Sequence, residues 1–434
     1  MSKGKIKIVI YMCALLLCIL LFWTWYQTKE QEDYKIAMPD EYSLSMMVQE
    51  SRYSLGLQRM IKKIFVEEKI RINVQVIPDE QASSIIRMKV NTGTVPDLLG
   101  FNLPAVYGLI KPELYLENLE NEKWTAQLKQ PMYKGEPIYD TYGMPFQENL
   151  GLGGIIYNKE VFAQYHIEVP TTEEEFEQVC EELAGYGITP VLMCSDRKIP
   201  QMWMDYTIPL AMGGNEACEK MVEAVVKGES TLEEYPQIAT VIDDYLNLFE
   251  KEWVNEDYLS IEYQEALKRL VDGNGAMMMG NYGTVGDAKY VDNEVALGMY
   301  SVPFSYNVNH EMVTPYTSYG LVIFQESEKK DLAKKVLELW STPDYLELWF
   351  MESGGDSSFQ GVETKPIVLE LRQQYESYMK EHEILYEWNT HILPFYNVNI
   401  DKMWLYYMEA PERNSTGQEL LQQFSQDVEL YLER

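Results

Sequence analysis

The sequence predicts an α/β fold in which helices cover mostly parallel β-sheets. Between residues 42 and 99, segments with the two-residue period of a strand alternate with segments of helical period. A second alternation begins at residues 151–157, where a glycine-rich apolar strand leads into two helices. The chain has 434 residues, which is enough for about two domains of this kind.

The first alternation contains three expected strands. Residues 42–49 and 70–77 form the first two, and a third ends at residues 98–100. Helices are expected between them over residues 53–68 and 81–90. Strands that are connected through helices in this way run parallel in one sheet.

Polar residues follow the carboxyl ends of these strands. Ligands of open α/β sheets bind beyond that edge, so Glu50 and Asn102 are candidate ligand contacts. Asp97 lies in the turn before the third strand, and two interpretations apply to it. It either contacts a ligand or caps the backbone amides of its own turn.

The second alternation is marked by helix caps. Asn158 is an N-cap for a helix over residues 159–165, and Thr172 with Glu175 forms a capping box for the next helix. Further along, the pattern predicts strands at 188–194, 295–302 and 316–324 and helices at 176–185, 231–251, 261–271, 329–340, 343–351 and 417–432.

Composition narrows the classes of function. The chain has 68 acidic and 36 basic residues and a net charge of −32. Such a surface repels phosphate backbones, so nucleic-acid binding is not expected. Cys180, Cys194 and Cys218 lack the spacing of a metal site, and the four histidines show no close pairing. We expect neither a metal nor a cofactor, while one disulfide among the three cysteines stays open.

The first residues predict a membrane anchor. Residues 8–26 carry no charge and are long enough to span ~30 Å of hydrocarbon as a helix. Three lysines precede them, which places the rest of the chain outside the cell. We expect residues 1–27 to form one transmembrane helix and residues 28–39 a stalk. A cleaved signal peptide and a lipoprotein anchored through Cys18 are alternatives, but the small residues that cleavage requires are missing.

The order and spacing of these segments resemble the extracellular solute-binding proteins of ABC importers, family 1, whose members bind sugars. Between residues 142 and 176, two positions depart from the family pattern: His166 replaces a glycine and Glu173 replaces a tryptophan, both at helix ends. The matching residues lie in two stretches: Phe65, Glu67, Ile72, Val74, Gly93, Pro96 and Asp97; and Tyr142, Gly143, Pro145, Tyr157, Asn158, Lys159, Phe162, Pro170, Thr172, Glu175 and Phe176. A third stretch, residues 272–282, is similar to a helix-turn-strand-loop unit of the family.

This resemblance implies a two-lobed, periplasmic-binding-protein-like fold of type II, whose lobes close at a hinge over a small ligand. Lobe 1 is then expected over residues 40–148 and 300–342, and lobe 2 over residues 149–299 and 343–434. The chain would cross between the lobes first after Glu148 and again near residue 303.

The resemblance also implies site residues. Glu148, at the first crossing, is a candidate partner for sugar hydroxyls, although a solvated loop has the same pattern. Trp203 and Asp205 lie in an aromatic-rich segment that the family places beside its ligand, with a core position as the alternative for Trp203. Tyr282 takes the place of a family tryptophan, and Tyr319 is expected to face the cleft; both rings could stack on the C–H face of a pyranose.

The function implied is the capture of a mono- or oligosaccharide outside the cell and its delivery to ABC permease subunits, without enzymatic activity. One alternative is a membrane-tethered sugar sensor or scaffold with the same fold, which an uncleaved anchor favours. Another is a glycoside hydrolase that uses two carboxylates, but no catalytic motif stands out in the sequence.

Overall fold

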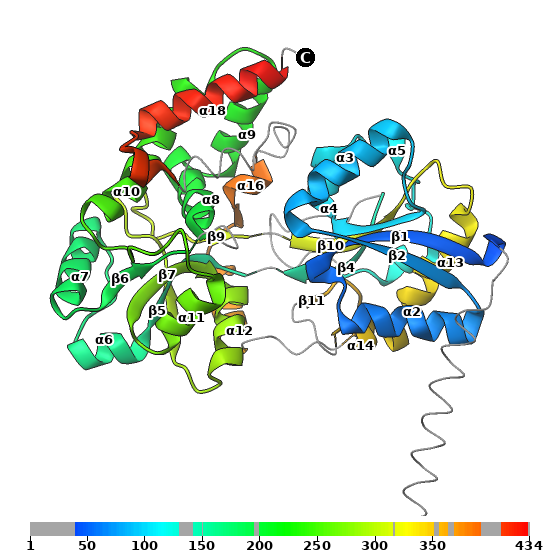
Figure 1. Cartoon of the computed structure of the whole chain (residues 1–434), viewed down its shortest axis with the longest axis horizontal. Helices are drawn as coiled ribbons and strands as arrows, with labels where there is room; N and C mark the ends of the chain where they lie inside the picture. The colour runs from blue at the N-terminus through cyan, green and yellow to red at the C-terminus, as the bar shows by residue number, and fades with distance from the viewer. Residues whose placement is uncertain are drawn as a thin grey trace, which may run out of the picture.

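The chain forms two α/β lobes, each with its own six-stranded sheet (Figure 1). The computed structural model describes residues 40–129, 142–149, 151–194, 199–315, 317–350, 356–362, 369–391 and 409–432. The expected anchor and stalk, residues 1–39, lie outside these ranges. Among the helices that are described, none is long and apolar enough to cross a bilayer.

The first lobe is built on a sheet with the strand order β11-β4-β10-β3-β1-β2. β1 is parallel to β2 and β3, whereas β10 is antiparallel to β3 and β4. Its strands are β1 (Ser43–Gln49), β2 (Arg71–Ile77), β3 (Leu98–Asn102), β4 (Met144–Asn149), β10 (Thr317–Ile323) and β11 (Asp356–Ser357). Its helices are η1 (Asp40–Tyr42), η2 (Glu50–Arg52), α2 (Leu55–Glu68), η3 (Asp79–Gln81), α3 (Ala82–Thr92), α4 (Leu103–Leu109), α5 (Pro112–Tyr115), η4 (Lys123–Gln127), α13 (Lys330–Trp340) and α14 (Pro343–Phe350).

Helices bury both faces of this first sheet. Met46 and Val48 of β1 pack toward the core formed with α2, α13 and α14, whereas Met47 points to the core formed with α3 and α4. This alternation follows from the two-residue period of a strand. Because both faces are covered, the strands have apolar side chains on both sides.

The second lobe has the strand order β12-β9-β5-β7-β6, with β8 paired to β5. Its strands are β5 (Gly153–Asn158), β6 (Thr189–Leu192), β7 (Gly275–Asn281), β8 (Leu297–Tyr300), β9 (Val313–Thr314) and β12 (Leu385–Tyr386). Its helices are α6 (Lys159–Tyr165), α7 (Glu173–Gly185), α8 (Ile199–Met212), α9 (Asn215–Val226), η6 (Leu232–Glu234), α10 (Pro236–Glu250), α11 (Tyr263–Val271), α12 (Tyr282–Val291), α15 (Leu369–Tyr378), α16 (Trp388–His391) and α18 (Gly417–Leu432).

The second sheet is more mixed than the sequence predicts. β6 and β7 are parallel, as expected for strands that a helical connection joins. β5, however, is antiparallel to β7, β8 and β9. β5 therefore does not fit the expectation of a mostly parallel sheet. It begins where the chain enters from the first lobe, and its neighbours β7, β8 and β9 run in the opposite direction, toward that lobe.

The predicted caps at the start of the second lobe are confirmed. The Asn158 side chain accepts hydrogen bonds from two amides of the first turn of α6, and Thr172 with Glu175 forms the capping box of α7. His166, which stands at a family glycine, ends α6 with φ of 58°. Side chains with a Cβ seldom adopt this left-handed conformation, which explains why glycine suits the position.

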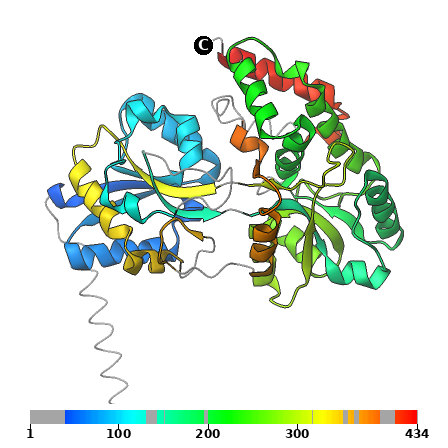
Figure 2. The same ribbon diagram turned by 180° about the vertical axis from the view of Figure 1, so that it is seen from behind.

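The described chain passes between the lobes at three places, and the later two differ from the expected boundaries. The first lies between β4, which ends at Asn149, and β5. The second lies between β9 and β10, because β8 and β9 still belong to the second sheet. α14 packs on α2 and β11 pairs with β4, so the chain remains in the first lobe until after β11 (Figure 2). Helix α15 then lies in the core of the second lobe.

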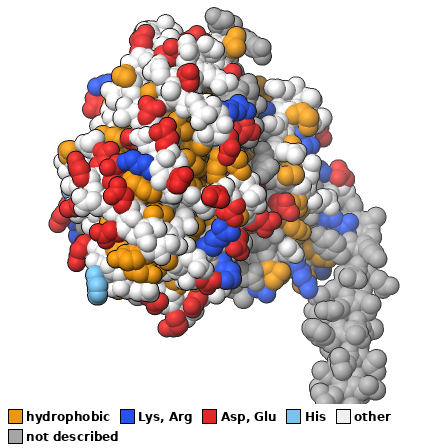
Figure 3. Space-filling model, turned by 60° about the vertical axis from the view of Figure 1, so that its left-hand side comes forward, with side chains coloured by type: hydrophobic (Ala, Val, Ile, Leu, Met, Phe, Trp, Pro, Cys, Tyr) orange, Lys and Arg blue, Asp and Glu red, His pale blue; other side chains and the backbone are white. Residues whose placement is uncertain are grey.

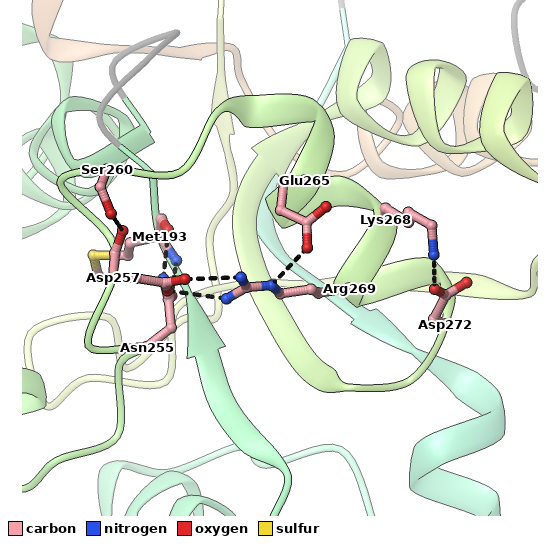
Figure 4. A network of polar contacts seen from close by, with 8 residues as sticks. All are labelled: Met193, Asn255, Asp257, Ser260, Glu265, Lys268, Arg269 and Asp272. Carbon is pink, nitrogen blue, oxygen red and sulfur yellow. Dashed lines mark hydrogen bonds and ion pairs between the residues drawn. The ribbon is translucent and has the colours of Figure 1, made fainter.

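A polar network fixes the carboxyl end of β6 in the second lobe (Figure 4). The Asn255 side chain accepts from the Met193 amide at 2.8 Å and donates to the Met193 carbonyl at 3.1 Å. Asn255 also donates to Asp257, which accepts two hydrogen bonds from the Arg269 guanidinium at 2.9 and 2.8 Å. The network ties the loop after β6 to α11.

We predict that this network stabilises the fold in a pH-dependent way. The Arg269 guanidinium lowers the pKa of Asp257 to about 2. Because the pKa of Asp257 is lower in the folded protein, its ion pair contributes its full stability above the pKa of the unfolded chain, about 3.9. This contribution is lost as the pH falls toward about 2. Because both side chains are partly exposed, Arg269→Gln should lower the free energy of unfolding by about 1 kcal/mol at neutral pH.

Urea unfolding at a series of pH values from about 7 to about 2.5 measures this effect. The difference between the two proteins should narrow as Asp257 becomes protonated. Lys268→Gln, which breaks the exposed pair with Asp272, is the control and should cost only about 0.3–0.5 kcal/mol. A difference that stays constant over this pH range would contradict the role given to Asp257.

Candidate functional site

A row of polar side chains lies at one end of the first sheet, on strands that are far apart in the sequence. β1 and β3 run parallel, so Glu50, which follows β1, and Asn102, which ends β3, lie at the same edge of the sheet. Tyr319 of β10 pairs with Asn102 on one side and with Gln147 of β4 on the other. Glu148 follows Gln147 in β4. The structure thus places four of the predicted residues, Glu50, Asn102, Glu148 and Tyr319, at the same end of the first sheet. Because Glu148 is level with Ser318 and not with Tyr319, its side chain leaves the sheet on the other face from those of Asn102 and Tyr319.

Two of these side chains offer hydrogen-bonding groups that are largely removed from bulk water. Asn102 is half-buried, and its Oδ1 atom has no hydrogen-bond partner among the described residues. Glu148 is buried and lies close enough to Lys129 to favour the charged form of that ammonium group, although burial lowers the pKa of Lys129 on balance. Glu50 is exposed at the rim. Amide and carboxylate oxygens in such positions accept hydrogen bonds from hydroxyl groups.

Tyr319 does not offer a ring to a ligand, contrary to the prediction. Only 2% of the side chain is exposed. The ring stacks on Trp349 with centroids 5.1 Å apart and planes at 9°, and the Arg52 guanidinium lies over it at 5.4 Å. The hydroxyl points toward Gly100, where a Cβ would come within 2.3 Å of it. The residue is part of the first-lobe core because β10 is a central strand.

Asp97 lies at the amino end of β3, opposite to the polar row. Its Oδ2 accepts hydrogen bonds from the amide and the hydroxyl of Ser45, both at 2.7 Å, and its Oδ1 accepts one from the Ser327 hydroxyl at 2.6 Å. The carboxylate therefore joins the start of β1 to the loop before α13. These contacts favour a structural role for Asp97 over a ligand contact, but the amide that it binds is that of Ser45 in β1 and not one of its own turn.

Glycines let two tyrosine rings pack on the chain where it enters the second lobe. A Cβ on Gly151 would lie 2.7 Å from the ring of Tyr282, and a Cβ on Gly153 would lie 2.7 Å from the ring of Tyr206. No other residue type leaves room for such an approach. The glycine-rich run of the sequence is thus explained by the rings that cover it.

Tyr282 is held from several sides. Its hydroxyl donates to the backbone carbonyl of Leu371, and its ring meets that of Tyr375 edge-on at 6.5 Å. Burial raises the pKa of the Tyr282 hydroxyl well above its usual value. The side chain remains half-buried. A ligand contact by Tyr282 therefore stays a prediction, and the structure adds a second role in joining the crossing segment to α15.

The aromatic-rich segment forms α8, and its two predicted residues lie in different surroundings. Trp203 is 1% exposed and meets Phe304 edge-on in the core, so the prediction that it contacts ligand is wrong and the core interpretation holds. Asp205 is buried and accepts a hydrogen bond from Gln201 at 3.2 Å. It lies near the Tyr206 hydroxyl, to which Asn281 donates at 3.0 Å.

Other polar residues of this region were not predicted. Asn281 ends β7 and is level with Gly153, Thr314 ends β9 just before the second crossing, and Glu387 and His391 flank α16. Asn281 directly precedes Tyr282 in the sequence, which could have drawn attention to it. The others belong to short elements without a recognisable motif, so no sequence signal placed them here.

An ion pair connects the lobes beside the last crossing. Arg372 of α15 donates from Nη1 to Asp356 of β11, and from Nε to Glu376 at 3.0 Å. Asp356 pairs with Glu148 across the sheet. Charges of both signs from Lys129, Glu148, Asp356 and Arg372 thus meet where the two lobes join.

A comparison with known families decides the class of this protein. The model of the bacterial extracellular solute-binding proteins matches residues 50–347. The chain belongs to this family. A multiple sugar-binding protein of Streptococcus mutans is 24% identical over 153 residues, and the match covers 35% of this chain and 36% of that protein. The chain thus matches about a third of the length of this relative.

Solved structures agree with a two-lobed solute-binding fold. A binding protein of Bacillus subtilis in an open conformation has a TM-score of 0.70 at 15% identity, covering 90% of this chain and 98% of that one. A sugar transporter of Bacillus licheniformis, solved in complex with stachyose, has a TM-score of 0.68 at 18% identity, covering 89% and 98%. At these identities, the likeness shows the fold alone.

The family and the matched proteins are binding proteins, in agreement with the expectation that the chain is not an enzyme. Within the described ranges, no three His, Cys, Asp or Glu side chains are grouped as a metal site. The three described cysteines are buried and no disulfide joins them; burial raises the pKa of the Cys218 thiol to about 12.

We predict that Asp97 affects stability and not ligand binding. Asp97→Ala removes three hydrogen bonds to a carboxylate and should lower the free energy of unfolding by about 2–4 kcal/mol. Ser327→Ala removes one of them and should cost less. Chemical unfolding and calorimetric titration of any ligand measure the two effects separately. A loss of affinity without a loss of stability would contradict the placement of Asp97 away from the site.

Proposed function

We propose that this solute-binding protein captures a carbohydrate between its two lobes. The observation that carries the proposal is the polar row of Asn102 and Glu148 in the first lobe, close to the first crossing. Asp205, Tyr206 and Asn281 gather in the second lobe on the other side of that crossing. Acceptors from both lobes near a shared hinge are what a polyhydroxylated guest requires.

The relatives support a saccharide as the guest. The matched relative is named a multiple sugar-binding protein, and similar structures were solved with stachyose and with raffinose. Another similar structure is a chitin oligosaccharide binding protein. Closure of the lobes would exclude water and strengthen each hydrogen bond to the guest. Half-buried Tyr282 supplies the ring nearest to the first crossing, on which a pyranose could stack.

The proposed setting is the outer face of the cell membrane. The apolar run at residues 8–26 would anchor the chain, and residues 28–39 would hold the lobes clear of the bilayer. Captured sugar would then pass to the permease subunits of an ABC importer. Acidic side chains are prominent on the face that Figure 3 shows, which favours solubility and is a poor match for anionic polymers.

A thermal-shift screen against mono- and oligosaccharides tests the proposal. A ligand present at about a hundred times its Kd adds about 2.7 kcal/mol of stability, which shifts the melting temperature by several degrees. Asn102→Ala should then weaken the binding of the active saccharide by about 1–3 kcal/mol, because it removes a buried acceptor.

The matched control is Asn293→Ala, which removes the same group from an exposed loop and should leave affinity unchanged. Isothermal titration calorimetry of the three proteins gives the affinities. A protein that ignores every saccharide but responds to amino acids or peptides would refute the proposed ligand class.

The anchor is tested separately by mass spectrometry of the protein purified from membranes. We expect an intact amino-terminal segment that includes residues 1–27, because the small residues of a cleavage site are missing. The protein should also stay in the membrane fraction after a high-salt wash, which removes proteins bound by charge alone. A mature chain that begins after residue 27, or at a lipid-modified Cys18, would contradict the anchor.

A further inference from the structure

Three elements of the second lobe that pack together, α8, β9 and α16, carry five polar residues. Gln201 and Asp205 come from α8, Thr314 from β9, and Glu387 and His391 from the two ends of α16. α8 packs against both β9 and α16, and the Glu387 amide donates to the Thr314 carbonyl. α16 lies on the inner side of its lobe in both ribbon views (Figures 1 and 2). We call these five residues the acceptor cluster.

Three atoms of the acceptor cluster have no hydrogen-bond partner within the part of the chain that the structure describes. They are Gln201 Oε1, Thr314 Oγ1 and His391 Nε2. The exposed fractions of these side chains are 8%, 0% and 8%. Folded proteins pair nearly all buried polar atoms, so several unpaired atoms in one region point to a bound partner.

The unpaired atoms are mainly acceptors. The amide group of Gln201 already donates to Asp205 at 3.2 Å, which leaves Oε1 to accept. His391 is neutral, because burial lowers its pKa to about 4. A hydrogen bond to the Tyr386 backbone occupies its protonated nitrogen, so Nε2 is left as an acceptor. The Thr314 hydroxyl can accept as well as donate.

The acceptor cluster also contains two carboxyl groups. Asp205 and Glu387 both lie near the Tyr206 hydroxyl, whose pKa rises because of burial first and the Glu387 carboxyl group next. Burial raises the pKa of Glu387 to about 8, which favours its protonated form at neutral pH in the empty protein. A cation bound beside this carboxyl group would favour its ionised form.

We propose that the acceptor cluster is a subsite for a primary ammonium group, such as that of an amino sugar. An ammonium group has three donors, no acceptor and one positive charge. It therefore matches Gln201 Oε1 and His391 Nε2 as acceptors and compensates the two carboxyl groups. A sugar hydroxyl has only one donor and no charge. The inference rests on the proposed function and specifies the chemical class of its ligand.

Matched saccharides that differ only at carbon 2 test this subsite. Glucosamine, N-acetylglucosamine and glucose, together with the β-1,4-linked oligomers of each, are titrated into the full-length protein by isothermal titration calorimetry. The amine member of a matched set should bind about tenfold or more tightly than both neutral members, because it forms charge-assisted hydrogen bonds. This comparison uses the unaltered protein, so it does not depend on how any variant folds.

Variants then test whether the preference for the amine arises at the acceptor cluster. Asp205→Asn and Glu387→Gln keep the shape of each side chain but remove its charge, and each should abolish the preference for the amine while neutral saccharides still bind. Glu381→Gln, an exposed change before α16, is the control and should keep the preference.

The outcomes separate the two proposals. Equal or tighter binding of the neutral members would overturn the ammonium subsite and leave the capture of sugars standing, with water as the partner of the unpaired atoms. A protein that binds no member of this panel and no other saccharide would overturn both. A preference for the amine that survives in both charge-removing variants would also overturn the assignment to the acceptor cluster.

Discussion

The close contact between tyrosine rings and the glycine-rich backbone at the first crossing is the constraint on which the arrangement of the lobes depends. Gly151 and Gly153 lie under the rings of Tyr282 and Tyr206, at distances that a Cβ would make impossible. Gly154, next along, faces the carbonyl of Tyr300 on β8 with equally little room. These glycines therefore allow β5 to lie between β9 and β7 in the second sheet, directly after the segment that connects it to the first lobe.

The same contact links the fold to the site. Tyr206, which covers Gly153, accepts a hydrogen bond from Asn281 and lies beside the acidic groups of the acceptor cluster. Tyr282, which covers Gly151, binds the backbone of α15 through its hydroxyl. Groups that position the hinge are thus neighbours of groups that are available to a ligand, so occupation of the site and movement of the lobes would affect the same side chains.

The two sides of the hinge differ in whether a buried acidic group has a cation close to it. In the first lobe, Glu148 and Asp356 lie near Lys129 and Arg372, so each buried or half-buried charge has an opposite one close by. This compensation is what makes buried charge tolerable. In the second lobe, Glu387 has no such cation among the described residues, and its carboxyl becomes harder to ionise. In the proposed subsite, the ammonium group of the ligand would supply the opposite charge that Glu387 lacks in the empty protein.

Aromatic residues illustrate why a site is harder to predict than a fold. Trp203 and Tyr319 are of the type that binds sugars, and the sequence places them beside the expected cleft. The structure uses both in cores, where Phe304 and Trp349 cover their rings. An aromatic side chain buries a large apolar area in either role, so the sequence pattern around it is the same whether the partner is protein or ligand.

Local chemistry in the sequence determined the elements of this protein. The two-residue period of β1, the cap at Asn158 and the capping box at Thr172 depend on neighbouring residues only, and each was predictable for that reason. The resemblance in order and spacing extended these elements to two lobes. Tertiary structure alone decided that Asp97 joins β1 to the loop before α13, that the chain returns to the first lobe at β10, and that β9 and α16 pack against α8, which carries Asp205. These contacts join residues separated by tens to hundreds of positions, and no periodicity or cap within a short window can encode such a meeting.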